Sequence, residues 1–241
     1  MQFEEIIKKL ESLKNPRNVE GMARFGIRPK TKVYGIAIPE LRKLAKIIKK
    51  DHKLALKLWD SKIHEARILA GFIADAKLIT EKQMDKWIKG FDSWDVVDQV
   101  CSSLFDKTNF VYKKVLELSK REKEFEKRTA FTLMACLAVH DKKMKDKDFL
   151  KFFPIIKKAV NDERNFVKKS VNWALRQIGK RNKNLNKEAI KLAREIIQLV
   201  EKEKVHPHTK QSYGVGAKWI ANNALAELIS ESVQKRISNK K

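Results

Sequence analysis

A tryptophan and an aspartate one helical turn apart form the clearest chemical candidate in this sequence. Trp94 and Asp98 lie in FDSWDVVDQVCSSLF (91–105), and at 100° per residue they share a helix face that Cys101 and Phe105 continue. Ser93 suits the N-cap position, but Asp98 lies beyond the first turn, where capping cannot explain it. A carboxylate in a partly dry, aromatic-walled site would stabilise developing positive charge. An ordinary ion pair with a neighbouring helix is the alternative interpretation.

A second tryptophan lies among cations. On a helical projection of residues 163–180, Lys169, Trp173, Arg176 and Lys180 fall within about 60° of one another, opposite the apolar stripe. A nucleic-acid groove uses this combination, because the cations meet phosphates and the ring meets a sugar or base. In the alternative interpretation, Trp173 packs between neighbouring helices and the cations are solvated.

Arg128 is a third candidate, because Thr132 and Ala135 share its helix face. A cation among small side chains leaves room for a backbone phosphate of DNA. A solvated arginine would produce the same pattern, so the two interpretations stay open.

The elements that position these residues are predicted to be helices. The chain of 241 residues has only 8 glycines and 5 prolines, and nearly every segment carries a 3.6-residue apolar period. Thr80 and Gln83 indicate a capping box before the helix that holds Trp87. The predicted helices are 1–14, a helix starting at Pro39, 64–77, a helix following Thr80, 94–105, 108–119, 122–140, 147–159, 163–180, 187–203 and 214–233. The basic stretch 15–35 is expected to be a connecting loop.

Several of these helices resemble one another. Residues 128–143 align with 169–183, which places Phe125 against Phe166 at an offset of 41 residues, and 64–77 is a weaker copy. Helix pairs with a period near 40 residues are typical of HEAT or armadillo repeats. We therefore predict an all-α, curved α-solenoid of HEAT-like helix pairs with a concave basic face; a plain helical bundle is the alternative. We expect a single domain over 1–241, with a frayed basic tail from about 234.

The charge balance favours a polyanionic partner. The chain has 54 Lys and Arg against 30 Asp and Glu, a net charge of +24, which favours nucleic acid without identifying it. No apolar run is long enough for a transmembrane helix, and two cysteines, Cys101 and Cys136, suit a reducing compartment. We expect a cytoplasmic protein, associated with the nucleoid when bound to DNA, and no membrane partner. Nucleotide-binding and zinc-ligand spacings are absent, so no cofactor and no metal are expected.

Several stretches together resemble the AlkD-like family of DNA alkylation repair proteins, which are HEAT-like repeat DNA glycosylases. The stretches that carry the resemblance are MARFGI (22–27), YGIAIPELRKL (34–44), LWDSKIHEARILA (58–70), SWDVVDQV (93–100), EFEKRTAF (124–131), FVKKSVNWALRQIGK (166–180) and KWIANNALAEL (218–228). The combination of W-D-x-x-D with a later N-W-A-L-R is specific, whereas each piece alone is weak.

The resemblance implies hydrolytic excision of positively charged alkylated purines, such as N3-methyladenine and N7-methylguanine. It implies that Asp98 is the catalytic carboxylate and that Trp94 and Trp173 flank the sugar of the lesion. It also implies that Arg128 engages the DNA backbone, and Phe25 stands where the family often has a tyrosine. Double-stranded DNA with alkylated bases is then the partner of a monomeric enzyme. The rival predictions are a non-catalytic HEAT-repeat protein that recognises damaged or branched DNA, and an RNA- or protein-binding scaffold.

Overall fold

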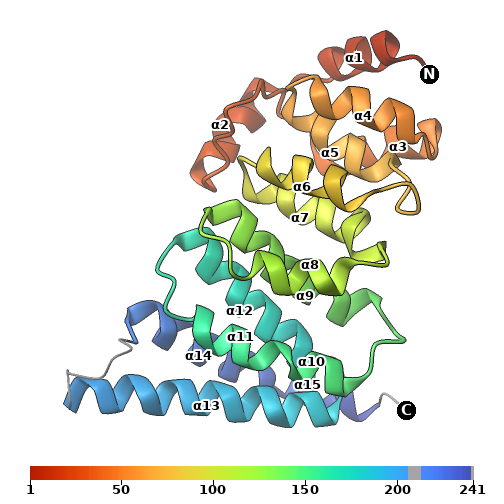
Figure 1. Cartoon of the computed structure of the whole chain (residues 1–241). Coiled ribbons are helices and arrows are strands. Elements are labelled where there is room, and N and C mark those ends of the chain that lie inside the picture. Colours follow the sequence, from red (N-terminus) through yellow and green to blue (C-terminus); the bar gives the residue numbers. More distant parts are fainter. Residues whose placement is uncertain (206–212, 240–241) are drawn as a thin grey trace. The chain divides into compact units, whose positions relative to one another are not determined.

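The computed structural model describes residues 1–205 and 213–239, and these residues form helices joined by short loops (Figure 1). Within those ranges the only strand-like feature is an isolated bridge between Lys32 and Ile63. No helix in the described part of the chain is both long and apolar enough to cross a membrane. The prediction of an all-α protein is confirmed.

The chain divides into two compact units, Met1–Lys113 and Lys114–Lys241, and the single domain expected over 1–241 stays a prediction. The helices of the first unit are α1 (Phe3–Ser12), α2 (Pro16–Arg24), α3 (Ile38–Ile48), α4 (His52–Asp60), α5 (His64–Ile73), α6 (Glu81–Lys89), α7 (Trp94–Ser103) and the 3₁₀ turn η1 (Phe105–Lys107). The boundary between the units falls within α8 (Val111–Leu118). Those of the second unit are α9 (Glu124–His140), α10 (Asp146–Leu150), α11 (Phe152–Ala159), α12 (Asn165–Gly179), α13 (Lys183–Val205), α14 (Val215–Leu228) and α15 (Glu231–Ser238).

Four sequence expectations need correction. Residues 16–24 form α2 and not a loop, because Asn15 caps the helix through Asn18 N and Pro16 occupies its first position. The helix expected over 147–159 is two helices, α10 and α11. The helix expected over 214–233 is likewise interrupted, because α14 ends at Leu228 and α15 begins at Glu231. Residues 234–238 belong to α15 and not to a frayed tail, because Val233 and Ile237, one turn apart, are both buried. Residues 240–241 of that tail lie outside the described residues.

Helix α5 is central to the first unit, where it packs against α3, α4 and α7. Its residues are buried on almost every side. Gly71 permits the close approach to α7, since a Cβ atom there would lie 2.9 Å from Cγ2 of Val100. Beside these helices, Trp59 stacks on Trp87 with ring centroids 4.2 Å apart. Helix α7, which carries Trp94 and Asp98, therefore packs against a dense layer of buried side chains.

In the second unit, α12 packs against α9, α13 and α14. Phe125 and Phe166 stack at the start of α9 and α12, with ring centroids 5.7 Å apart. These are the two residues that the predicted repeat offset of 41 aligns. The repeated sequence pattern thus corresponds to two neighbouring, similarly packed helices.

Candidate nucleic-acid interface

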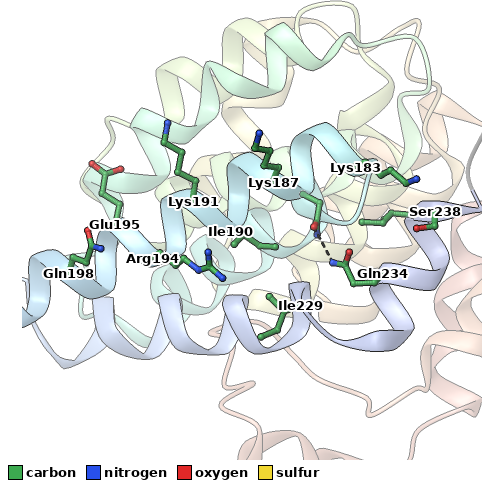
Figure 2. Close-up of a pocket in the computed structure, with 12 residues that line it drawn as sticks. Lys183, Lys187, Ile190, Lys191, Arg194, Glu195, Gln198, Ile229, Gln234 and Ser238 are labelled. Carbon is green, nitrogen blue, oxygen red and sulfur yellow. Dashed lines mark hydrogen bonds between the residues drawn. The ribbon is translucent and has the colours of Figure 1, made fainter.

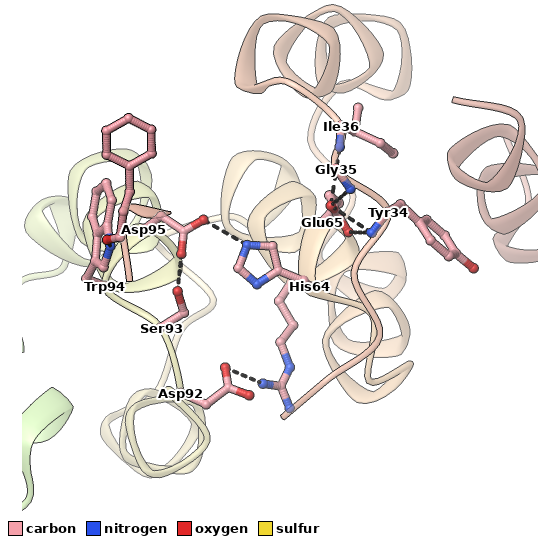
Figure 3. Close-up of polar contacts among 11 residues, drawn as sticks. Tyr34, Gly35, Ile36, His64, Glu65, Asp92, Ser93, Trp94 and Asp95 are labelled. Atoms are coloured by element: carbon pink, nitrogen blue, oxygen red, sulfur yellow. Dashed lines mark hydrogen bonds and ion pairs between the residues drawn. The ribbon is translucent and has the colours of Figure 1, made fainter. Parts of the chain in front are cut away.

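Trp94, the first residue of α7, is held by the loop that follows α2. Its Nε1 atom donates a hydrogen bond to the backbone oxygen of Phe25 at 3.1 Å (Figure 3). The indole is partly exposed, and the Phe25 side chain is 72% exposed. The structure therefore brings together two of the predicted site residues and leaves an aromatic ring of this loop open to solvent.

Asp98 follows Trp94 by one turn of α7 and is also partly exposed. Val97 and Val100 face the core, which confirms the separate apolar stripe of this helix. Cys101 and Phe105, which the sequence places on the face of Trp94 and Asp98, are fully buried. The accessible part of the predicted face consequently ends at Asp98, and Cys101 packs in the interior.

A buried histidine fixes the first turn of α7. Nε2 of His64 lies 2.8 Å from Oδ2 of Asp95, and the Ser93 hydroxyl donates to the other carboxylate oxygen (Figure 3). Ser93 occupies the predicted N-cap position but bonds to this side chain and makes no side-chain cap bond to the backbone. His64 is 1% exposed, and the side chain of Asp95 is 13% exposed. Asp95 is thus a partner of His64 as well as an acid at the N-terminus of a helix.

Burial and pairing act in opposite directions on the pKa values of this pair. Burial lowers the pKa of His64, but the hydrogen bond and charge of Asp95, assisted by Glu65 and Asp92, raise it above its usual 6.5. Burial raises the pKa of Asp95, but His64 and Ser93 lower it below 3.8. Both shifts favour the charged pair, His64⁺ with Asp95⁻.

A buried carboxylate holds the loop before α3. Glu65, 1% exposed, accepts hydrogen bonds from the backbone N–H groups of Tyr34, Gly35 and Ile36, the shortest at 2.6 Å from Gly35 (Figure 3). Gly35 has φ +73°, a conformation that favours glycine. These hydrogen bonds fix the end of the loop from Phe25 to Ile36 against α5.

A second contact holds the same loop near α7. The carboxylate of Asp92 accepts from Lys30 N at 2.9 Å and lies 3.5 Å from Nη1 of Arg67. Arg67 also donates to the carbonyl of Gly90. The segment that precedes Trp94 and the loop that carries Phe25 therefore share one polar network.

In the second unit, Trp173 is partly exposed on α12, and Lys169 on the same helix is exposed. Arg176 and Lys180 both form ion pairs with one carboxylate, Glu227 of α14. Burial raises the pKa of Glu227, but the hydrogen bonds from Lys180 and Arg176 bring it below its usual value. The face that the sequence of α12 predicts to be purely cationic thus also contains Glu227 from α14.

Arg128 lies in α9 with only 5% of its surface exposed. Its Nη1 atom donates to the backbone oxygen of Phe166 at 2.6 Å, which links α9 to α12. Thr132 and Ala135, the small residues on its face, are fully buried. The contact with a DNA phosphate stays a prediction, and the structure adds a role for this guanidinium within the unit.

Three polar contacts were missed in the sequence because the partners are remote. His64 and Asp95 are 31 residues apart, Glu65 and Gly35 are 30 apart, and Arg176 and Glu227 are 51 apart. The only sequence signals were a histidine and a glutamate at the start of the α5 pattern, where a core helix should be apolar. The pairing itself leaves no periodic trace.

The described helices and these two surfaces define an all-α helical-repeat protein with aromatic and charged residues on partly exposed helix faces. Its fold is similar to that of a solved structure from a new family of proteins related to the HEAT-like repeat DNA glycosylases, with affinity for branched DNA structures. The TM-score is 0.75 at 20% identity, over 98% of this chain and 96% of that one. This likeness confirms a HEAT-like repeat fold over a plain bundle.

The family model for DNA alkylation repair enzymes matches residues 6–212, so the chain belongs to that family. A relative from Listeria monocytogenes, the uncharacterized protein Lmo0209, is 27% identical over 108 residues. That match covers 44% of this chain and 48% of the relative, about half the length of each.

Proposed function

We propose that this protein is a DNA glycosylase that excises positively charged alkylated purines from double-stranded DNA, of the N3-methyladenine and N7-methylguanine type. The observation that carries the proposal is the placement of Asp98 one turn after Trp94, both partly exposed on α7. Membership of the DNA alkylation repair enzyme family supports the same reaction class. We expect the enzyme to act as a monomer in the cytoplasm, without a metal or cofactor.

The chemistry suits a carboxylate and an indole. A purine alkylated at N3 or N7 carries positive charge, so the bond from C1′ to the base nitrogen breaks with its electron pair going to the base. The sugar then develops oxocarbenium character, which the Asp98 carboxylate stabilises. Water adds to C1′ and gives its proton to Asp98, and the products are the free base and an abasic site.

The aromatic residues contribute to the same step. The face of the Trp94 indole attracts positive charge on the sugar, and the hydrogen bond to Phe25 O orients the ring. Exposed Phe25 contacts the DNA beside it. We propose the same role for Trp173, attraction of positive charge on the sugar, and its partial exposure near the cations of α12 supports this.

Charged residues of the second unit supply contacts with the DNA backbone in this proposal. Lys169 is exposed and carries no competing ion pair among the described residues. Arg176 and Lys180 share Glu227, so each brings less than a full charge to a phosphate. Affinity should fall steeply with salt because phosphate contacts release counterions.

An excision assay with Asp98→Asn tests the proposal. Single-turnover release of N7-methylguanine from a methylated duplex should slow by about 100-fold or more, whereas binding to the same duplex should change little. Asp60→Asn is the matched control, because it makes the same chemical change at an exposed ion pair with Lys86. Release by Asp98→Asn at the wild-type rate, with normal binding, would refute the mechanism.

A second candidate function is non-catalytic recognition of branched DNA. It is supported by the similarity of fold to a protein of a family with affinity for branched DNA structures. The wild-type protein would then release no methylated base, and would bind an undamaged four-way junction more tightly than a linear duplex of equal length. Base release together with equal affinity for both DNAs would exclude this candidate.

A further inference from the structure

Four cations form a stripe along α13 that the proposed reaction does not use. Lys183, Lys187, Lys191 and Arg194 are all exposed and are separated by four, four and three residues, so they lie on one face of the helix (Figure 2). At about 1.5 Å per residue, the stripe extends over roughly 17 Å. We call these four residues the α13 stripe.

This arrangement lowers the stability of the helix that carries it. Like charges three or four residues apart repel one another on a helix surface. Lys183 is the first residue of α13, and the first turn contains no acid, so this cation also opposes the positive end of the helix dipole. An anion bound along the stripe would offset both effects.

Two acids near the stripe are engaged elsewhere, and Glu188 of α13 forms no ion pair with it among the described residues. Glu195 pairs with Lys157 at 2.5 Å, and Asp146 accepts from the side-chain amides of Asn182 and Asn184. No ion pair joins a described carboxylate to any member of the α13 stripe. By contrast, Arg176 of α12 and Lys180, the residue that follows this helix, share Glu227. The charge of the stripe is therefore available to a ligand.

The stripe borders a cleft of about 1050 Å³ between α13 and the segment formed by the end of α14 and α15. Ile229, 52% exposed, and Gln234 lie across from α13 in Figure 2. The Gln234 amide is held by Asn186 Oδ1 and Leu228 O, which gives this side of the cleft a fixed shape. None of the residues that line the cleft belongs to α12, so it is a different surface from that of Trp173.

We propose that the α13 stripe binds the sugar–phosphate backbone of a second DNA segment, separate from the one that presents the lesion. The proposal rests on the DNA binding in the proposed function. A line of cations one turn apart matches a line of phosphates. Of the apolar side chains that line the cleft, only Ile229 and Ile190 are accessible to any extent, and two are too few for the series of anchors that an amphipathic protein helix needs.

The consequence is that one molecule can hold two duplexes together. A sandwich assay tests this with undamaged DNA: a short duplex is immobilised, the protein is added, and capture of a second, labelled duplex is measured. The wild-type protein should capture the second duplex. The variant K183Q/K187Q/K191Q/R194Q should bind the immobilised duplex with similar affinity and capture at least about tenfold less of the second.

A matched control removes the same four charges elsewhere in the second unit. The variant K142Q/K143Q/K145Q/K147Q changes four exposed lysines and should capture the second duplex as the wild type does. Equal loss in both variants, or no loss in the α13 variant, would overturn the proposal. Circular dichroism of both variants verifies that the helices are retained.

Two further outcomes separate this inference from its premises. Wild-type protein that binds one duplex but captures no second would refute the α13 stripe alone and leave the glycosylase proposal intact; failure to bind any duplex would refute both. A polyglutamate peptide that displaces the second duplex better than unlabelled DNA of equal charge would assign the cleft to an acidic protein segment instead. Asp98→Asn should capture DNA normally, because bridging needs no chemistry.

Discussion

The Nε2 atom of His64 lies 2.8 Å from the Oδ2 atom of Asp95, which joins the first residue of α5 to the second residue of α7. The contact is buried at the His64 end and nearly so at the Asp95 end. Trp94 directly precedes Asp95 in α7, and Asp98 lies three residues after it. The His64–Asp95 contact therefore sets the position of both proposed site residues. The interior of the first unit thereby controls the orientation of the face that we propose as the functional site.

Replacement of this histidine should destabilise the protein in a pH-dependent way. The pKa of His64 is higher in the folded protein than in the unfolded chain, so its contribution is complete below about pH 6.5 and is lost as the pH rises through the folded value. The pKa of Asp95 is lowered, so its contribution is present above about pH 4 and is lost as the pH falls through the folded value.

The variant His64→Gln should therefore lose about 3 kcal/mol of unfolding free energy at pH 6 and less at pH 8.5. Urea unfolding at the two pH values measures the difference. His140→Gln, at an exposed position, serves as the control for removing a histidine. An equal loss by His64→Gln at both pH values would show that the pair is not charged.

Glu65→Gln should loosen the loop before α3. The substitution places an NH₂ group where two or three backbone N–H donors now converge on the carboxylate, so we expect a loss of about 2 kcal/mol. Hydrogen exchange at the amides of Tyr34 and Gly35 should accelerate. Glu40→Gln, which alters an exposed pair with Lys43, should leave that exchange unchanged. Unaltered protection in Glu65→Gln would contradict the assigned contact.

Glu227→Gln should strengthen DNA binding. The change releases Arg176 and Lys180 from their shared carboxylate, so more positive charge becomes available to phosphates. The dependence of log affinity on log salt should steepen by about one to two, as measured by fluorescence anisotropy with an undamaged duplex. Glu231→Gln makes the same charge change at an exposed pair with Lys235 and should have a smaller effect. Equal effects of the two substitutions would exclude Arg176 and Lys180 from the interface.

Arg128→Met should reduce stability more than it reduces DNA binding. The arginine is 5% exposed and donates to Phe166 O, and its loss leaves that carbonyl without this donor, at an expected cost of about 2 kcal/mol. Loss of the phosphate contact predicted from the sequence should also reduce the slope of log affinity against log salt by about one. An unchanged slope would show that the guanidinium acts only within the unit, through its bond to Phe166 O.

The local features of the sequence predicted most of the helices correctly. The apolar period identified α5, α7, α9 and α12, and the hydroxyl of Thr80 accepts from Gln83 N at 3.1 Å, as a capping residue should. Helix α2 was missed because its apolar face, formed by Val19, Met22 and Ala23, is short and only partly buried. Periodicity detects a helix only where one face is hidden from water.

The sequence likewise predicted only part of the candidate site. The spacing of Trp94 and Asp98 places them on one helix face in any context, and the structure shows both partly exposed. The same reasoning placed Cys101 beside them, but it is fully buried. Helical spacing specifies direction around an axis, whereas exposure depends on which neighbouring helices cover that direction.

By itself, the sequence determined the helical class, the repeat offset that stacks Phe125 on Phe166, and the excess of positive charge. Only the tertiary structure decided which charges are neutralised and which are available. Glu227 reaches Arg176 from 51 residues away, whereas the α13 stripe has no such partner among the described residues. The physical reason is that Coulomb interactions depend on distance in space, and packing brings together residues whose sequence separation carries no pattern.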